Sequence, residues 1–222
     1  LDGLFVCFDE IKLILRTLEK QLTLNKARNR ASGILVLAPS GCGKSSLIKY
    51  LKNIYPDKET ETNSLKRLVD FAIPAPVTVQ GMRESLLHAQ GDPLWNYGDA
   101  KEQKLRSHEH LKSCDTKILA IDNFHDIPEH RGVKGIKEVG NWVRDICETP
   151  FGGVILALGT EEAAGGRDSN KQLRRRIQTV LRISPFSIAN KEAAVRTIKC
   201  FDEIFKQLPL AEPCNLTSKA IL

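Results

Sequence analysis

The stretch that decides the fold is Ala38-Pro39-Ser40-Gly41-Cys42-Gly43-Lys44-Ser45-Ser46. It follows the apolar run Gly33-Ile34-Leu35-Val36-Leu37 and precedes Leu47-Ile48-Lys49-Tyr50-Leu51, a run typical of a helix. A strand, a glycine-rich turn that ends in Lys-Ser, and a helix form the context of a phosphate-binding P-loop. Ala38 stands where the motif usually has its first glycine. Because that position ends the strand, we expect a small side chain to suffice.

The chemistry of this turn favours a bound nucleoside triphosphate. Gly41 and Gly43 let the backbone wrap a polyphosphate, and the following helix directs its free N–H groups and its dipole at the negative charge. Lys44 is expected to reach the outer phosphates and Ser45 to hold Mg²⁺. A glycine-rich turn without a ligand would leave Lys44 and two serines unexplained. We therefore predict an ATP site formed by Pro39, Ser40, Gly41, Cys42, Gly43, Lys44, Ser45 and Ser46.

The bulk composition narrows the class of protein. A chain of 222 residues can bury one core with a small appendage. Its net charge of +6 favours polyanionic partners, with nucleic acid as the first candidate. The six cysteines include no C-x-x-C pair, a usage typical of reduced thiols in the cytoplasm. No apolar run approaches the roughly 20 residues that span a bilayer, so we expect a soluble cytoplasmic protein without membrane contact.

The chain alternates between strand-like and helix-like segments. Apolar runs predict strands at 33–37, 68–73, 117–122, 153–158 and 179–183. Helical spacing predicts helices at 9–23, 44–55, 78–90, 101–113, 133–148, 170–177 and 190–206, and a further helix start at Ser218. Residues 26–30 are expected to be a basic linker and the polar residues 57–64 a loop. The missing initial Met and the end soon after Ser218 lead us to expect a fragment.

This alternation predicts an α/β fold with a five-stranded, mostly parallel sheet flanked by helices. We expect an N-terminal helix and linker at 1–30, a P-loop core at 31–185 and a partial helical lid at 186–222. Ligands of such sheets bind beyond the carboxyl ends of the strands. The P-loop, Asp122 and Thr160 all follow strands, so we expect them to converge on one site.

The second half of the predicted site begins at Asp122. Four apolar residues lead to this carboxylate, as in a Walker B strand that reaches the Mg²⁺ shell. Asn123 follows, and an amide can orient water but cannot accept its proton. We therefore expect slow hydrolysis, or the use of His125, Asp126 or Glu129. For His125 a role in positioning or in partner contact is favoured over that of a base.

The remaining histidines raise the question of a metal site. Besides His125, the candidates are His130 and the pair His108 and His110. Because no cysteine stands at ligand spacing near them, zinc is not expected.

Two further features belong to the site or to its neighbour. Thr160 can sense the γ-phosphate, or its hydroxyl can cap the helix that starts at Glu161, or both. Residues 165–182 carry six basic side chains and one acidic one. We expect one of Arg174, Arg175 and Arg176 to be an arginine finger in the site of a neighbouring subunit. The alternatives are a solvated basic face or contacts with a phosphate backbone.

The order of these motifs is similar to that of one family. A-P-S-G-C-G-K-S, LVDFAIP, G-D-P, ILAIDNFH, ILALGTEEA and QLRRRI follow one another over roughly residues 9–188. This series resembles the TniB/TnsC group of AAA+ ATPases, the target-selection regulators of DNA transposons. The strand before A-P-S-G-C-G-K-S and this loop itself occur in all P-loop ATPases. The proline after the second strand, G-D-P, D-x-F-H and L-G-T-x-E-A are more specific.

The resemblance implies a function as well as an AAA+ fold. Such proteins assemble with ATP into rings or filaments on duplex DNA, mark a target site and recruit or stimulate the transposase, bridging it to a targeting protein. By motif, Lys44, Ser45, Asp122 and Thr160 would hold or sense ATP and Mg²⁺, and Arg176 would be the finger. Members usually have Glu where Asn123 stands, which puts turnover in question but not nucleotide-dependent assembly.

The DNA contacts of ring ATPases come from loops that face the central channel. The corresponding candidates are Arg131, Lys134 and Lys137, just after the Walker B strand. Their contacts would be with phosphates and would not depend on base sequence. An exposed helix start with ordinary lysines is the equal alternative.

Three other functions remain open at this stage. Asn123 suits a structural scaffold that binds ATP but hardly hydrolyses it. Another AAA+ helper, such as a helicase loader or an initiator-like ATPase, would bind a replicative helicase and not a transposase. A signalling ATPase with a regulatory P-loop would have no affinity for duplex DNA.

Overall fold

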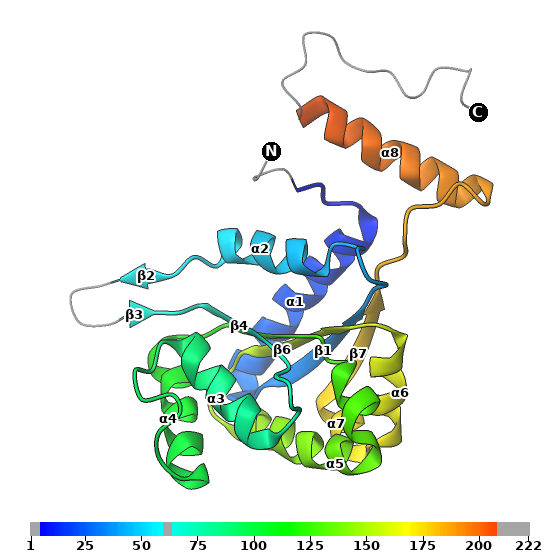
Figure 1. Cartoon of the computed structure of the whole chain (residues 1–222). Coiled ribbons are helices and arrows are strands. Elements are labelled where there is room, and N and C mark those ends of the chain that lie inside the picture. The colour runs from blue at the N-terminus through cyan, green and yellow to red at the C-terminus, as the bar shows by residue number, and fades with distance from the viewer. Residues whose placement is uncertain (1–4, 60–63, 208–222) are drawn as a thin grey trace.

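The computed structural model describes residues 5–59 and 64–207, and its centre is a five-stranded sheet (Figure 1). The order of the strands is β4-β5-β6-β1-β7, and every neighbouring pair is parallel. The predicted α/β fold with a parallel sheet is therefore confirmed. The strands are β1 (Ser32–Leu37), β4 (Leu68–Ala72), β5 (Ile118–Asp122), β6 (Val154–Gly159) and β7 (Ile177–Arg182).

Helices cover both faces of this sheet. They are α1 (Asp9–Arg28), α2 (Lys44–Ile54), α3 (Val79–Gln90), α4 (Ala100–Ser113), α5 (Asp126–Glu148), α6 (Glu161–Ser169) and α7 (Lys171–Arg176), and α8 (Lys191–Gln207) follows outside these layers. Because side chains alternate along a strand, β1 sends Leu35 to the layer of α3 and α5 and Ile34 to the layer of α1 and α2. One buried cluster thus lies on each face of the sheet, between the strands and the helices that cover them.

The first helix is longer than its periodicity predicted. Ile11, Ile14 and Leu18 form its buried stripe, as the spacing required, but α1 continues to Arg28. It ends at Asn29, whose φ of 48° is left-handed, a conformation that Asn tolerates. The prediction of a linker from residue 26 was therefore wrong for residues 26–28.

Other boundaries also differ from the predictions, including the start of β7 at Ile177 and not at Thr179. Residues 57–64 are not all loop, because β2 (Lys58–Glu59) pairs antiparallel with β3 (Ser64–Leu65). The helix predicted at 133–148 begins at Asp126 and is interrupted by the non-helical Gly132. The helix predicted at 170–177 is the shorter α7, where the Asn170 side chain accepts hydrogen bonds from the N–H groups of Gln172 and Leu173.

The C-terminal helix α8 runs away from the layers of the core (Figure 1). Its Arg196 ties it back by donating to the Glu10 carboxylate of α1 and to the carbonyl of Ser184, 3.2 Å away. The helix predicted at 190–206 is confirmed, whereas the predicted start at Ser218 lies outside the described residues. No helix in the described part of the chain has both the length and the apolarity to cross a membrane.

Candidate nucleotide site

The P-loop connects β1, which lies between β6 and β7, to α2. Gly41 and Gly43 have φ values of +78° and +83°, a left-handed conformation that glycine adopts without strain. A Cβ atom at either position would meet no atom within 4 Å. The requirement for glycine is therefore conformational, and the space above the loop is open to a ligand.

A hollow of about 380 Å³ lies over this loop. It brings together three parts of the chain that the sequence analysis assigned to one site: the P-loop, the end of β5 and the end of β6. Its walls are formed by Ser40, Gly41, Gly43, Lys44, Ser45, Ser46, Asp122, Asn123, His125 and Thr160. In a parallel sheet the carboxyl ends of all strands point the same way and lie next to one another, which explains this convergence.

Two residues of the predicted P-loop site lie outside this hollow. Pro39 lines a neighbouring hollow of about 350 Å³, which Thr160 also borders. The Cys42 side chain packs against the buried cluster under α1 and α2, and its N–H donates to the Pro39 carbonyl at 3.3 Å. Cys42 can therefore contribute to a ligand only through its backbone.

The Lys44 side chain folds back onto the start of the P-loop. Its Nζ donates to the Ala38 carbonyl at 2.8 Å and to the Pro39 carbonyl at 3.1 Å. The first turn of α2, which Lys44 begins, has N–H groups without partners inside the helix, and Ser45 and Ser46 are exposed there. This end of the hollow is thus rich in donors and suits an anion.

Asp122 and Asn123 form a tight turn at the end of β5. Asp122 Oδ1 accepts a hydrogen bond from the Asn123 N–H at 2.9 Å. Asn123 has a φ of 56°, in the left-handed region where Asn is several-fold enriched. This conformation turns the chain into α5, with one carboxylate and one amide at the edge of the hollow.

His125 follows Asn123 by two residues and lines the hollow. Its side chain is 19% exposed, and Nε2 lies 3.6 Å from Asp126 Oδ1. Its buried Nδ1 has no hydrogen-bond partner in the described part of the chain. Asp126, Glu129 and His130 have ligand atoms within 4.8 Å of one another, but exposed groups of this kind are common without a metal.

Thr160 occupies the N-cap position of α6 without acting as a side-chain cap. Its hydroxyl instead donates to the Glu162 carboxylate, and this hydrogen bond lowers the pKa of Glu162. The alternative of a capping hydroxyl is therefore wrong in this structure. Glu162 is the glutamate of the L-G-T-x-E-A motif, but the sequence did not reveal that it would accept a hydrogen bond from Thr160.

The predicted finger Arg176 is held by an ion pair. Its side chain is 19% exposed, and Nη2 donates to Glu148 Oε1 at 2.9 Å. It directly precedes β7, whereas the P-loop follows the parallel strand β1, so Arg176 and the P-loop of its own chain lie at opposite ends of the strands. Arg174 and Arg175 are exposed.

The three predicted DNA contacts surround the interruption of α5 at Gly132. Arg131 pairs with Glu138 at 3.2 Å. Lys134 and Lys137 are exposed, and within residues 5–59 and 64–207 they form no ion pair. Two cations at this place are therefore available to a partner.

Solved structures with the same fold are P-loop ATPases. A Walker-type ATPase of Pyrococcus abyssi matches with a TM-score of 0.58 and 16% identity, over 89% of this chain and 58% of that one. The ORC1 protein of Aeropyrum pernix, solved in complex with DNA, matches with a TM-score of 0.59 and 15% identity, over 93% and 50%. The ORC2 protein of Aeropyrum pernix, in ADPNP-ADP complexes, matches with 0.60 and 12%, over 91% and 52%.

This chain thus spans between half and three fifths of the length of these structures. At such identities the likeness shows the fold, which is that of an AAA+ P-loop ATPase. No curated protein sequence matches the chain. The family model of the bacterial TniB protein matches residues 3–186, a range that includes the P-loop, Asp122, Thr160 and Arg176. The chain therefore belongs to the TniB family.

Proposed function

We propose that this protein is an ATP-dependent regulator of DNA transposition. In this proposal it forms a homo-oligomer on duplex DNA, marks the target site, and recruits or activates the transposase together with a targeting protein. The observation that carries the proposal is a hollow that unites a P-loop with Asp122 and Thr160 in a chain of the TniB family.

The residues of the hollow fit ATP and Mg²⁺. Two left-handed glycines with open space above them, next to the free N–H groups of α2, suit a polyphosphate. Lys44 would leave the Ala38 and Pro39 carbonyls for the outer phosphates, and Ser45 and Asp122 would hold Mg²⁺. When bound, ATP supplies a γ-phosphate whose presence or loss distinguishes two states of the site.

Thr160 is suited to sense that difference. Its hydroxyl donates to Glu162 here, and it lines the same hollow as Lys44. Exchanging the Glu162 carboxylate for a phosphate oxygen would release the first turn of α6. We infer that Thr160 couples the state of the nucleotide to this helix.

Duplex DNA would be held through its phosphates. Lys134 and Lys137 are exposed and unpaired with any described acidic group, and Arg131 could join them by leaving Glu138. Contacts with phosphates do not depend on the base sequence, and they weaken as the salt concentration rises. This matches a regulator that accepts many target sequences.

The first test is sedimentation with duplex DNA of random sequence in the presence of ADP, a slowly hydrolysed ATP analogue or no nucleotide. We expect large assemblies only with the ATP analogue, and co-sedimentation of the transposase with them. A double variant, Lys134→Ala with Lys137→Ala, should reduce the slope of log affinity against log salt by about 2. The matched control changes Lys101 and Lys112 on α4, which are exposed as well. A protein that stays small under every condition would contradict the proposal.

Asn123 favours one second candidate, a scaffold locked in the ATP state. An amide in place of the usual carboxylate cannot accept the proton of the attacking water. Such a scaffold would assemble on DNA in the same way but would not disassemble as ATP is consumed. Single-turnover hydrolysis on the assembled complex separates the two candidates.

A further inference from the structure

The outer edge of β4 presents backbone groups that pair with no other described strand. Within residues 5–59 and 64–207, β4 ends the sheet and pairs only with β5. The Arg67 carbonyl and the Ile73 N–H face β5, because they bond to Ile118 and Asp122 at 3.0 Å each. Successive residues of a strand face opposite edges, so Asp70 and Ala72 present their N–H and C=O groups outward. A free edge of this kind is a template for another strand.

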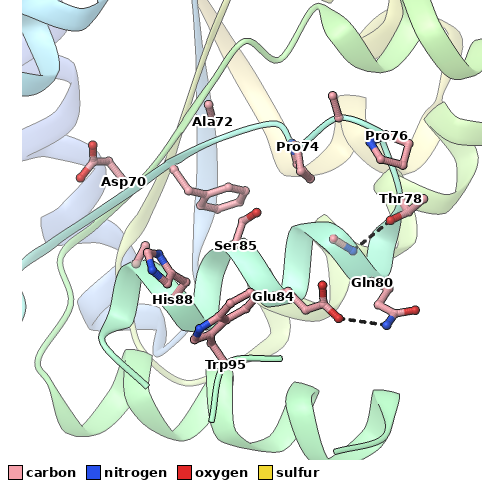
Figure 2. A pocket seen from close by; sticks show the side chains of 14 residues that line it. Asp70, Ala72, Pro74, Pro76, Thr78, Gln80, Glu84, Ser85, His88 and Trp95 are labelled. Carbon is pink, nitrogen blue, oxygen red and sulfur yellow. Dashed lines mark hydrogen bonds between the residues drawn. The ribbon is translucent and has the colours of Figure 1, made fainter. Parts of the chain in front are cut away.

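A hollow of about 660 Å³ follows this edge (Figure 2). It is bounded by β4, by the loop that carries Pro74 and Pro76, and by α3. Gly81, Ser85 and Ala89 line it at intervals of four residues, so α3 turns a face of small side chains toward the strand. There is consequently room for a polypeptide chain beside β4.

The charge of this hollow is opposite to that of the whole chain. Its lining contains two carboxylates, Asp70 and Glu84, and no Lys or Arg. Asp70 is paired with Lys52 at 2.7 Å. Glu84 accepts a hydrogen bond only from the neutral Gln80, at 2.9 Å, and forms no ion pair with a described residue (Figure 2). In a chain of net charge +6, this carboxylate favours a basic ligand group.

The loop that contributes Trp95 to the hollow also carries two exposed apolar side chains. Leu94 and Tyr97 are 54% and 70% exposed, and Trp95 between them lines the hollow. Arg106 fixes their loop by donating to the Leu94 carbonyl at 2.7 Å and to the Tyr97 carbonyl at 2.8 Å. An apolar surface on a pre-organised loop is typical of a protein-binding site.

We propose that β4 and this hollow bind an extended segment of a partner protein as an added strand. The segment would bond to the outward groups of Asp70 and Ala72, place a Lys or Arg at Glu84 and pack an apolar side chain against Trp95. In this mode the main chain supplies affinity and the side-chain positions supply specificity. The surface is distinct from the nucleotide site, because the two hollows share no lining residue.

The test uses two fluorescein-labelled dodecapeptides of alternating Val and Thr, one with three Lys substitutions and one with three Glu at the same positions. Fluorescence anisotropy should show that the Lys peptide binds at least about fivefold more tightly than the Glu peptide. Ala72→Pro should weaken binding of the Lys peptide about fivefold, because it removes one outward N–H without touching the ladder to β5. Glu84→Lys should reverse the preference between the peptides.

The control for Glu84→Lys is Glu109→Lys, an equal change of charge at an exposed position of α4. It should leave both affinities as in the wild type. Lys44→Ala should also keep peptide binding, so failure of the nucleotide proposal and failure of this one are distinguishable.

Three results would overturn the proposal. The first is the absence of binding, or equal binding of the two peptides. The second is a pair of folded variants, Ala72→Pro and Glu84→Lys, that bind as the wild type does. The third is concentration-dependent association of the protein alone that Ala72→Pro abolishes, since a second copy of the chain would then occupy the edge.

Discussion

At the scale of single residues, Lys44 is the strongest test of the nucleotide site. Its amine lies on two P-loop carbonyls, within the hollow that also contains Asp122. Charged hydrogen bonds contribute about 1.5–3 kcal/mol each, so Lys44→Ala should weaken binding of a fluorescent ATP analogue by at least about tenfold. Lys49→Ala, an exposed change on the same helix, is the control. Equal affinity in all three proteins would mean that the P-loop does not hold the phosphates.

Asn123 tests what limits hydrolysis. We expect Asn123→Glu to raise ATP turnover by about 10²-fold, because a carboxylate can accept the proton of the attacking water. The φ of 56° at this position costs a Glu residue about 1 kcal/mol, so the gain could be partly offset. Turnover is measured as phosphate release at saturating ATP.

The control for this change is Asn123→Gly, which accepts the left-handed backbone but supplies no carboxylate. It should hydrolyse ATP at the wild-type rate. If the Glu variant is no faster than the Gly variant, the amide is not the limiting group, and His125 becomes the next residue to change.

At the scale of elements, the Asp92–Arg106 pair joins the end of α3 to α4. Burial by itself raises the pKa of the Asp92 carboxyl, but hydrogen bonds from the Leu94 N–H and from Arg106 outweigh it and lower the pKa below 3.8. The ionised form is therefore favoured in the folded protein. Its stabilisation is complete above the unfolded pKa near 3.9 and is lost as the pH falls through the folded value.

Asp92→Asn should consequently destabilise the protein at pH 7 by about 2 kcal/mol, since the 5% exposed site loses a charged acceptor. As the pH falls through the lowered pKa of folded Asp92, the difference between the variant and the wild type should shrink. Unfolding is therefore compared at pH 7 and at an acid pH below that pKa. Urea unfolding at both pH values measures it. Asp57→Asn, at an exposed position, should follow the wild type at each pH. A difference that does not depend on pH would contradict the assignment to Asp92.

At the scale of the whole molecule, the arginine finger tests the assembly. Arg176 precedes β7, whereas the P-loop of its own chain follows β1, so the two lie at opposite ends of the strands. Arg176 can therefore act only in the nucleotide site of a neighbouring subunit. Arg176→Ala should lower hydrolysis on DNA about 10³-fold. Mixing it with Lys44→Ala should restore measurable turnover, because one protein supplies an intact P-loop and the other an intact finger.

Arg174→Ala and Arg175→Ala are tested in the same mixtures, since both residues are exposed. Arg30→Ala is the structural control, because Arg30 lies 3.8 Å from the same Glu148 that pairs with Arg176. If Arg176→Ala keeps full activity and one of its two neighbours does not, the ion pair with Glu148 is structural and the exposed residue is the finger.

Most of the fold was predictable from local patterns. The apolar runs that end at Leu37 and Asp122 can be buried only as strands of a sheet covered on both faces. Thr78 and the Gly91 turn bound α3 as predicted, because capping depends on neighbouring residues. The errors were the end of α1, where the buried Asn25 donates to the distant Gly153 carbonyl at 2.8 Å, the interruption of α5 at Gly132, and the missed pairing of β2 with β3.

The sequence by itself determined the P-loop, the Walker B carboxylate and the alternation of strands and helices, because these depend on backbone conformation and on spacing within a few residues. Only the tertiary structure decided that Arg176 pairs with Glu148, that Thr160 donates to Glu162, and that β4 ends the sheet with a free edge. These features depend on which distant segments become neighbours. The order of the strands in the sheet decides which segments become neighbours, and the residue pattern along a single strand does not reveal this order.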